Sequence, residues 1–90
     1  MPVLILHIRP EGAKHYLARV FDGTSLVGTP TLHVHIESAI KAYGDSAIQG
    51  VNAFEIWYGG WSMCTIPLVR MRTEADDLAK RLLVLSAVLR

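Results

Sequence analysis

The sequence contains few charged residues and few cysteines, and each shortage excludes a class of protein. Charged residues make up 19% of the 90 residues, against about 25% in an average soluble domain, and the net charge is only +1. A chain with so little net charge has no strong field to attract phosphate backbones or acidic lipid surfaces. The single cysteine, Cys64, cannot form an internal disulfide, which excludes a disulfide-rich scaffold and gives no argument for an oxidising compartment.

Long apolar runs and catalytic motifs are also missing. The run at residues 3–8 is too short for the core of a signal peptide, and the run at 82–89 is far shorter than the ~20 residues of a membrane span. The sequence has no phosphate-binding loop, no dinucleotide-binding motif and no Gly-x-Ser-x-Gly nucleophile motif. We therefore expect a cytoplasmic protein with no membrane segment, no catalytic residue, no cofactor and no enzyme activity.

Apolar residues, by contrast, are abundant. Hydrophobic residues make up 51% of the chain, and 90 residues are enough for one small domain, which we place at residues 1–90. On folding, a chain of this length removes about two-thirds of its extended surface from water. We therefore expect more apolar surface than one core can bury, and a second chain that covers the surplus.

Three strands are predicted in the first third of the chain. Residues 1–8 are apolar on both faces, which is typical of an interior strand. Residues 15–21 predict a second strand, and Asp22-Gly23 predicts a tight turn into a short third strand at residues 24–28. Together these strands predict an antiparallel meander.

A helix is predicted next, over residues 30–43. Thr29 can cap it, Pro30 suits its first turn, and Gly44 suits a left-handed residue past its end. The apolar residues that follow at helical spacing are Leu32, Ile36, Ala39, Ile40 and Tyr43.

The same stretch permits a second interpretation as a strand. In a strand, His33, His35 and Glu37 would project from one face, and two imidazoles with a carboxylate are half of a plausible zinc or non-haem iron site. In a helix, His33 and His35 point in nearly opposite directions and cannot share a metal. Because the helix also explains Pro30 and Gly44, we favour it and keep a metal-binding protein as the lesser alternative.

The C-terminal half predicts a second hairpin and a helix. Residues 53–58 and 61–67 flank a Gly59-Gly60 turn, so that Tyr58 faces Trp61, Ile56 faces Met63, Phe54 faces Thr65, and the other face carries Glu55, Trp57, Ser62, Cys64 and Ile66. Thr73 is expected to cap the last helix, whose apolar stripe consists of Met71, Ala75, Leu78, Leu82, Leu85 and Leu89. Beyond Leu82 the polar face disappears, which is typical of a helix that is buried all round.

These elements predict an α+β fold of order βββαββα. The sheet is expected to be antiparallel, built from the meander and the second hairpin, with two helices on one of its faces.

Two parts of the pattern resemble known families. Tyr16-Leu17-Ala18-Arg19 with the Asp22-Gly23 turn and a following helix resembles the arm-binding domains of phage integrases. That resemblance implies a sheet that reads nucleic acid, for which the hairpin offers Lys14 and Arg19, and Arg70 and Arg72 offer further phosphate contacts. The meander that leads through Gly28-Thr29 into a helix with Ile36, Ala39 and Ile40 is similar to antitoxins of the HicB type.

Aromatic residues concentrate in the second hairpin and point to an interaction surface. Four of the seven aromatic residues, Phe54, Trp57, Tyr58 and Trp61, lie there, and such side chains bury a large area with few rotatable bonds. We therefore expect a non-catalytic interaction or accessory domain that acts as a homodimer, with a weak nucleic-acid-binding module as the alternative. The expected interface residues are Trp57, Ile66, Leu83, Val84 and Val88.

Overall fold

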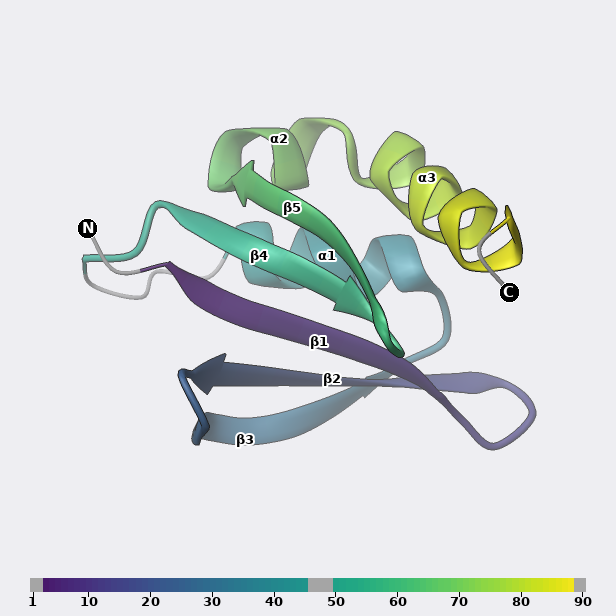
Figure 1. Cartoon of the computed structure of the whole chain (residues 1–90), viewed down its shortest axis with the longest axis horizontal. Helices are drawn as coiled ribbons and strands as arrows, with labels where there is room; N and C mark the ends of the chain where they lie inside the picture. Colours follow the sequence, from purple (N-terminus) through teal and green to yellow (C-terminus); the bar gives the residue numbers. More distant parts are fainter. Residues whose placement is uncertain (1–2, 46–49, 89–90) are drawn as a thin grey trace.

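A five-stranded sheet organises the fold. In the computed structural model, which describes residues 3–45 and 50–88, the chain forms five strands and three helices (Figure 1). The strands are β1 (Leu4–Glu11), β2 (His15–Asp22), β3 (Ser25–His33), β4 (Ala53–Tyr58) and β5 (Trp61–Pro67), and they lie in the order β3-β2-β1-β4-β5. The central place of β1 confirms the interior strand that its two apolar faces predict, and the α+β class is confirmed as well.

The sheet is mixed, so the wholly antiparallel sheet predicted above is wrong. β1 pairs with β2 in antiparallel orientation but with β4 in parallel orientation, with Leu4 opposite Phe54 and Ile8 opposite Tyr58. A parallel neighbour requires a long crossover, and helix α1 (Ile36–Gly44) lies in the segment that crosses from β3 to β4. The second hairpin therefore joins the sheet on the side of β1 that β2 leaves free.

The helix predicted from Pro30 begins only at Ile36, because β3 continues to His33. Pro30 is tolerated there since β3 is an edge strand, where a missing N–H removes no bond from the interior of the sheet. The pairing of β3 is irregular at this point, because three residues from Gly28 to Pro30 lie opposite the single residue Arg19. Gly28 has a φ of +71°, which glycine adopts without strain.

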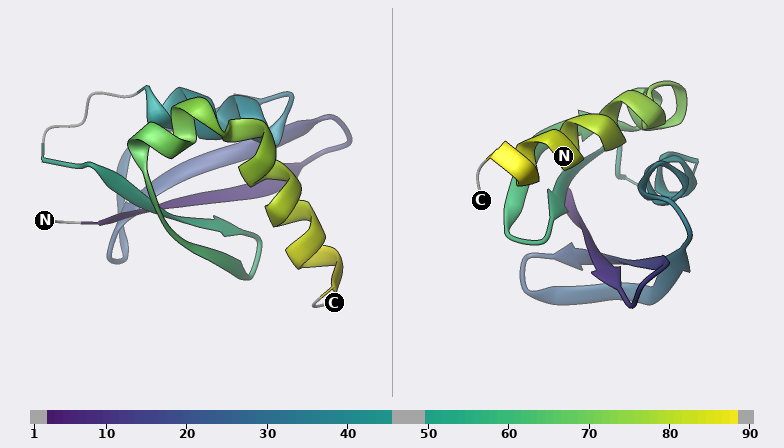
Figure 2. Two further views of the ribbon diagram at one scale, coloured as in Figure 1. Left: turned by 90° about the horizontal axis from the view of Figure 1, so that it is seen from above. Right: turned by 90° about the vertical axis from the view of Figure 1, so that its right-hand side faces the viewer.

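Three helices pack on one side of the sheet, where two were expected. The predicted C-terminal helix corresponds to α3 (Ala75–Val88), and the additional helix is α2 (Leu68–Thr73), which ends just before Glu74. The Thr73 hydroxyl donates to the Val69 carbonyl oxygen at 2.9 Å within α2, so Thr73 does not cap α3 as predicted. The sheet twists and curves around the helices, as Figure 2 shows.

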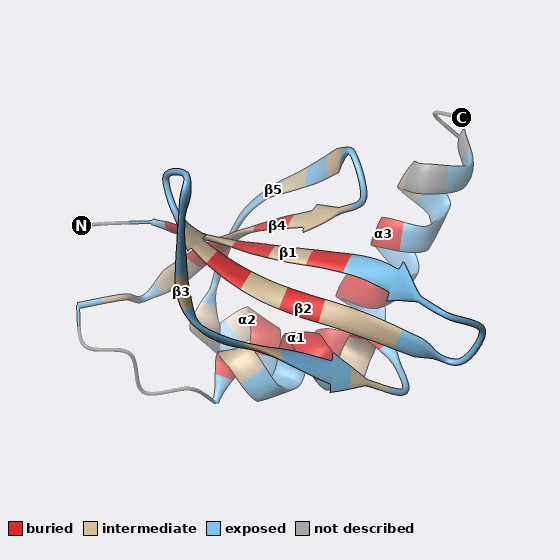
Figure 3. Cartoon of the chain, turned by 90° about the horizontal axis from the view of Figure 1, so that it is seen from below, coloured by how far each residue is buried: buried red, intermediate tan, exposed pale blue. Residues whose placement is uncertain are grey.

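The core lies between the sheet and the helices. Buried and half-buried residues alternate along β1 and β2, as expected for strands with one covered face (Figure 3). The largest fully buried side chains are Phe54, Leu6, Ile8, Ile40, Ile56, Met71, Leu78 and Leu82. The predicted helical stripe is therefore buried as far as Leu82. Beyond it, Leu83 is 45% exposed and Val84 is 61% exposed, so this end of α3 is not buried all round within one chain.

Gly44 serves close packing rather than the left-handed turn expected of it. It is the last residue of α1 and is buried, and it is not among the described glycines with positive φ. A Cβ atom at this position would lie 2.8 Å from the Cβ of Met71 and 3.0 Å from the backbone nitrogen of Arg72. Glycine therefore lets α1 and α2 approach each other closely.

A bulge in β5 changes the predicted register of the second hairpin. Tyr58 pairs with Trp61 as predicted, but Ile56 pairs with Cys64 and Phe54 with Ile66. The shift occurs at Met63 and Cys64, and Cys64 has a φ of +92°. Ile66 is therefore 3% exposed in the core, and its predicted place on the outer face is wrong.

Within the described residues, none of the helices has both the length and the apolar character that crossing a bilayer requires.

Candidate functional site

One face of the sheet is left open by the described elements, and it carries a group of apolar side chains. The strand residues whose neighbours are buried under the helices point to this opposite face. Figure 1 looks onto it, with α1 behind the sheet. We call these apolar side chains the open-face cluster: Ile5, Leu17, Phe21, Leu26, Leu32 and Trp57.

The open-face cluster extends across four strands. Phe21 of β2 lies between Ile5 of β1 and Leu26 of β3, and Leu17 lies opposite Leu32. Leu26 is 48% exposed and Leu32 is 58% exposed, which are large fractions for leucine side chains. The predicted helix over residues 30–43 placed Leu32 on its apolar side, so the sequence did not predict Leu32 as part of this surface.

Polar side chains occupy the middle of the open face. His7 Nε2 lies 2.9 Å from the Gly59 carbonyl oxygen, and Arg19 Nη2 lies 3.3 Å from His7 Nδ1. Because a carbonyl only accepts, Nε2 of His7 carries the proton and Nδ1 accepts from Arg19. Burial lowers the pKa of His7, and the nearby charges of Arg19 and Arg9 act in the same direction, although the Gly59 bond opposes them. His7 is thus a neutral imidazole in this network.

Arg19 and Glu55 place charges of opposite sign on the two strands that flank β1. The Arg19 guanidinium lies 5.3 Å from the ring centroid of Phe21, and its Nε is buried without a hydrogen-bond acceptor among the described residues. On the other side of β1, the Glu55 carboxylate accepts a hydrogen bond from Trp57 Nε1 at 2.8 Å and one from the Ser62 hydroxyl at 3.3 Å. The basic group therefore lies on β2 and the acidic group on β4.

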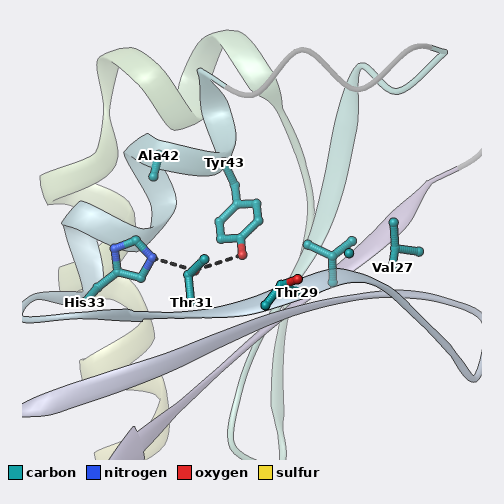
Figure 4. A pocket seen from close by; sticks show the side chains of 8 residues that line it. Val27, Thr29, Thr31, His33, Ala42 and Tyr43 are labelled. Atoms are coloured by element: carbon teal, nitrogen blue, oxygen red, sulfur yellow. Dashed lines mark hydrogen bonds between the residues drawn. The ribbon is translucent and has the colours of Figure 1, made fainter.

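A pocket lies on the other side of the sheet, between β3 and α1. Its cavity measures about 420 Å³. Val20, Val27 and Ala42 form apolar walls, and the side chains of Thr31, His33 and Tyr43 form a polar end (Figure 4). The irregular pairing of β3 also brings Gly28 and Thr29 to this pocket.

The polar end of the pocket is a chain of three hydrogen-bonding groups. Thr31 Oγ1 lies 2.8 Å from His33 Nε2 and 2.9 Å from the Tyr43 hydroxyl (Figure 4). The Tyr43 ring packs edge-on against Phe54 of the core at 6.2 Å and meets the His33 ring at 6.4 Å. These contacts fix the Tyr43 ring between the core and the pocket. Burial lowers the pKa of His33, so its ring is neutral at neutral pH.

The Thr31 hydroxyl and the His33 ring contact each other at the polar end of the pocket. A hydroxyl hydrogen-bonded to an imidazole has the geometry of a nucleophile with its base. Such a base also needs a third group to orient it, and no described residue makes a hydrogen bond to His33 Nδ1. We therefore interpret Thr31, His33 and Tyr43 as groups that can hold the polar part of a ligand.

The structure does not gather the predicted metal ligands into a site. His33 is the last residue of β3 and its ring lines the pocket, His35 precedes α1, and Glu37 lies in the first turn of α1. Over residues 3–45 and 50–88, no three His, Cys, Asp or Glu side chains lie close enough to hold a metal ion. The strand interpretation was right for His33 alone, because the chain bends at residues 34 and 35.

The basic residues proposed for nucleic-acid contact lie apart. Lys14 is exposed in the turn between β1 and β2, and Arg19 lies on the open face. Arg70 forms an ion pair with Glu74 at 3.3 Å, and Arg72 donates to the Gly44 carbonyl oxygen at 3.0 Å, both on the helical side. The four cations therefore do not form one basic surface.

The predicted interface residues fall into three locations. Trp57 lies on the open face, Leu83 and Val84 lie on α3, and Ile66 lies in the core. The side chain of Val88 lies outside the described residues. Thr31 and Tyr43, the partners of His33, were not predicted from the sequence, although the alternation of Val27, Thr29, Thr31 and His33 could have indicated a common face.

No protein-family model, curated protein or solved structure matches the chain. The two resemblances noted in the sequence therefore remain expectations.

Proposed function

We propose that this chain is a non-catalytic interaction domain that acts as a homodimer through its open face. The observation that carries the proposal is the open-face cluster, which leaves half-exposed leucines on the face of the sheet that no described helix covers. In ordinary β-sandwiches, two such faces pack against each other and the two sheets lie about 10 Å apart.

The distribution of charge on the open face supports pairing with a second copy. A symmetric dimer brings the same patch of both copies together, so the patch must be complementary to itself. A twofold axis along β1 would place β2 of one copy over β4 of the other. Arg19 would then meet the Glu55 and Trp57 side chains of the second copy.

The orientation of the twofold axis decides which charges meet. An axis across the strands would instead place β2 over β2 and bring two Arg19 side chains together. The charges therefore favour the axis along β1.

The test compares substitutions at two equally exposed apolar positions. Leu32 on the open face and Val69 on α2 are each 58% exposed. Burying the exposed half of a leucine contributes about 1 kcal/mol, and a dimer contains two such positions, so Leu32→Glu should weaken association by about 2 kcal/mol or more. That is a loss of roughly 30-fold in the dimer dissociation constant. Val69→Glu is the matched control.

Sedimentation equilibrium at micromolar concentrations provides the measurement. We expect wild type and Val69→Glu to have about twice the chain mass of 10.0 kDa, and Leu32→Glu to shift toward the monomer. Val84→Glu distinguishes the two predicted contact regions, because Val84 lies on α3. A monomeric wild type would refute the dimer, and a dimer that is lost in Val84→Glu but kept in Leu32→Glu would refute the open face.

A further inference from the structure

The pocket between β3 and α1 lies on the helical side of the sheet and is separate from the proposed dimer face. Its cavity of about 420 Å³ is within the range of about 300–1,000 Å³ that is usual for sites of small molecules. Such sites combine apolar walls with a few polar groups that fix the orientation of the ligand. Val20, Val27 and Ala42 provide the walls, and Thr31, His33 and Tyr43 provide the polar end.

The hydrogen-bond chain at the polar end has two possible directions. Thr31 has one hydroxyl hydrogen, so it donates either to His33 Nε2 or to Tyr43, and it accepts from the other. When Thr31 donates to His33, Tyr43 donates to Thr31 and its oxygen can accept from a ligand. When His33 donates to Thr31, Thr31 donates to Tyr43 and the Tyr43 O–H can donate to a ligand. A ligand hydroxyl, which both donates and accepts, fits either direction.

The charge of the lining favours an uncharged ligand. No acidic side chain, lysine or arginine is among the described residues that line the pocket, and burial keeps the His33 ring neutral at neutral pH. A carboxylate or an ammonium group would meet no opposite charge among these residues.

We propose that this pocket binds a small, uncharged and largely apolar molecule that carries one hydroxyl group, with the apolar part against Val20, Val27 and Ala42 and the hydroxyl at Tyr43. The proposal goes beyond the homodimer and does not depend on it, because the pocket lies on the other side of the sheet from the open-face cluster.

The test uses 2-naphthol as the probe and 2-naphthoate as its charged counterpart. Both are titrated into the full ¹⁵N-labelled chain at neutral pH, and the amide shifts are followed by NMR. We expect 2-naphthol to shift the amides of Val20, Val27 and Ala42 and to saturate. The carboxylate should bind at least about tenfold more weakly, since it meets no opposite charge in the pocket and lacks the hydroxyl that contacts Tyr43.

Three variants locate the site. Tyr43→Phe keeps the ring and removes the hydroxyl that meets the ligand, so it should weaken 2-naphthol binding by about tenfold, the worth of one hydrogen bond. Ala42→Leu places a larger side chain in the cavity from an exposed helix position and should abolish binding. Ala87→Leu makes the same change at an exposed position on α3 and should bind as the wild type does. The dispersion of amide signals shows that each variant is folded.

Three results would overturn the assignment. The first is the absence of shifts at millimolar 2-naphthol, and the second is binding that Tyr43→Phe and Ala42→Leu leave unchanged. The third is a loss of dimer mass in Ala42→Leu, which would assign the pocket to a side chain of a second copy.

Discussion

Replacement of Gly44 by alanine tests the close contact between α1 and α2. The added Cβ would lie 2.8 Å from the Cβ of Met71 and 3.0 Å from the backbone nitrogen of Arg72. Neither atom is the end of a flexible side chain, so the two helices must separate. Overpacking of this kind costs about 1–3 kcal/mol, and the higher helix propensity of alanine returns at most about 1 kcal/mol.

The expected net result is a loss of about 1–2 kcal/mol in the free energy of unfolding. For a domain of this size the melting temperature should fall by roughly 5–10 °C. Urea titrations followed by circular dichroism, at one fixed protein concentration, measure the difference from wild type. Gly60→Ala is the control, because no atom lies within 4 Å of its Cβ position and its φ is not positive; it should change stability by less than about 0.5 kcal/mol. A Gly44→Ala variant as stable as wild type would refute the reasoning.

Two further predictions concern Ile66 and the histidines. Ile66→Ala should lower the free energy of unfolding by about 2–5 kcal/mol, because the side chain is 3% exposed. Thr65→Ala, at the exposed neighbouring position, should have little effect. Equal effects of the two substitutions in urea unfolding would contradict the register of β5. Burial lowers the pKa values of His7 and His33 below the ordinary value of 6.5, so the unfolded chain binds more protons than the folded chain as the pH falls through this region. The free energy of unfolding should therefore decrease from pH 7.5 to pH 5, and a variant with both histidines changed to glutamine should show a smaller decrease; an unchanged slope would refute this.

Local sequence patterns predicted the strands better than their arrangement. The apolar faces of residues 1–8 and the Asp22-Gly23 turn identified β1 and the β2–β3 hairpin, because alternation and turn chemistry are local properties. The parallel pairing of β1 with β4 depends on the path of the chain through α1. No property of either strand by itself specifies that path.

The candidate sites depended on two irregularities that the local patterns conceal. Pro30 and Thr29 suit a helix start as well as they suit an edge strand, and only the pairing of Thr31 with Ala18 selects the strand. This choice places Leu32 on the open face and Thr31 in the pocket. In the second hairpin, the bulge at Cys64 reverses the face to which Ile66 points. Trp57 lies on its predicted face, because it pairs with Ser62 between the turn and the bulge.

The most direct test of the proposed dimer is a measurement of contacts between two copies. In a sample that mixes isotope-labelled and unlabelled chains, filtered NOE spectra detect only the contacts between copies. The twofold axis along β1 predicts NOEs from the side chains of Arg19 and Phe21 in one copy to the Trp57 ring in the other. Intermolecular NOEs confined to the methyl groups of Val84 on α3, or no intermolecular NOEs at concentrations where the chain sediments as a dimer, would contradict the proposed contact.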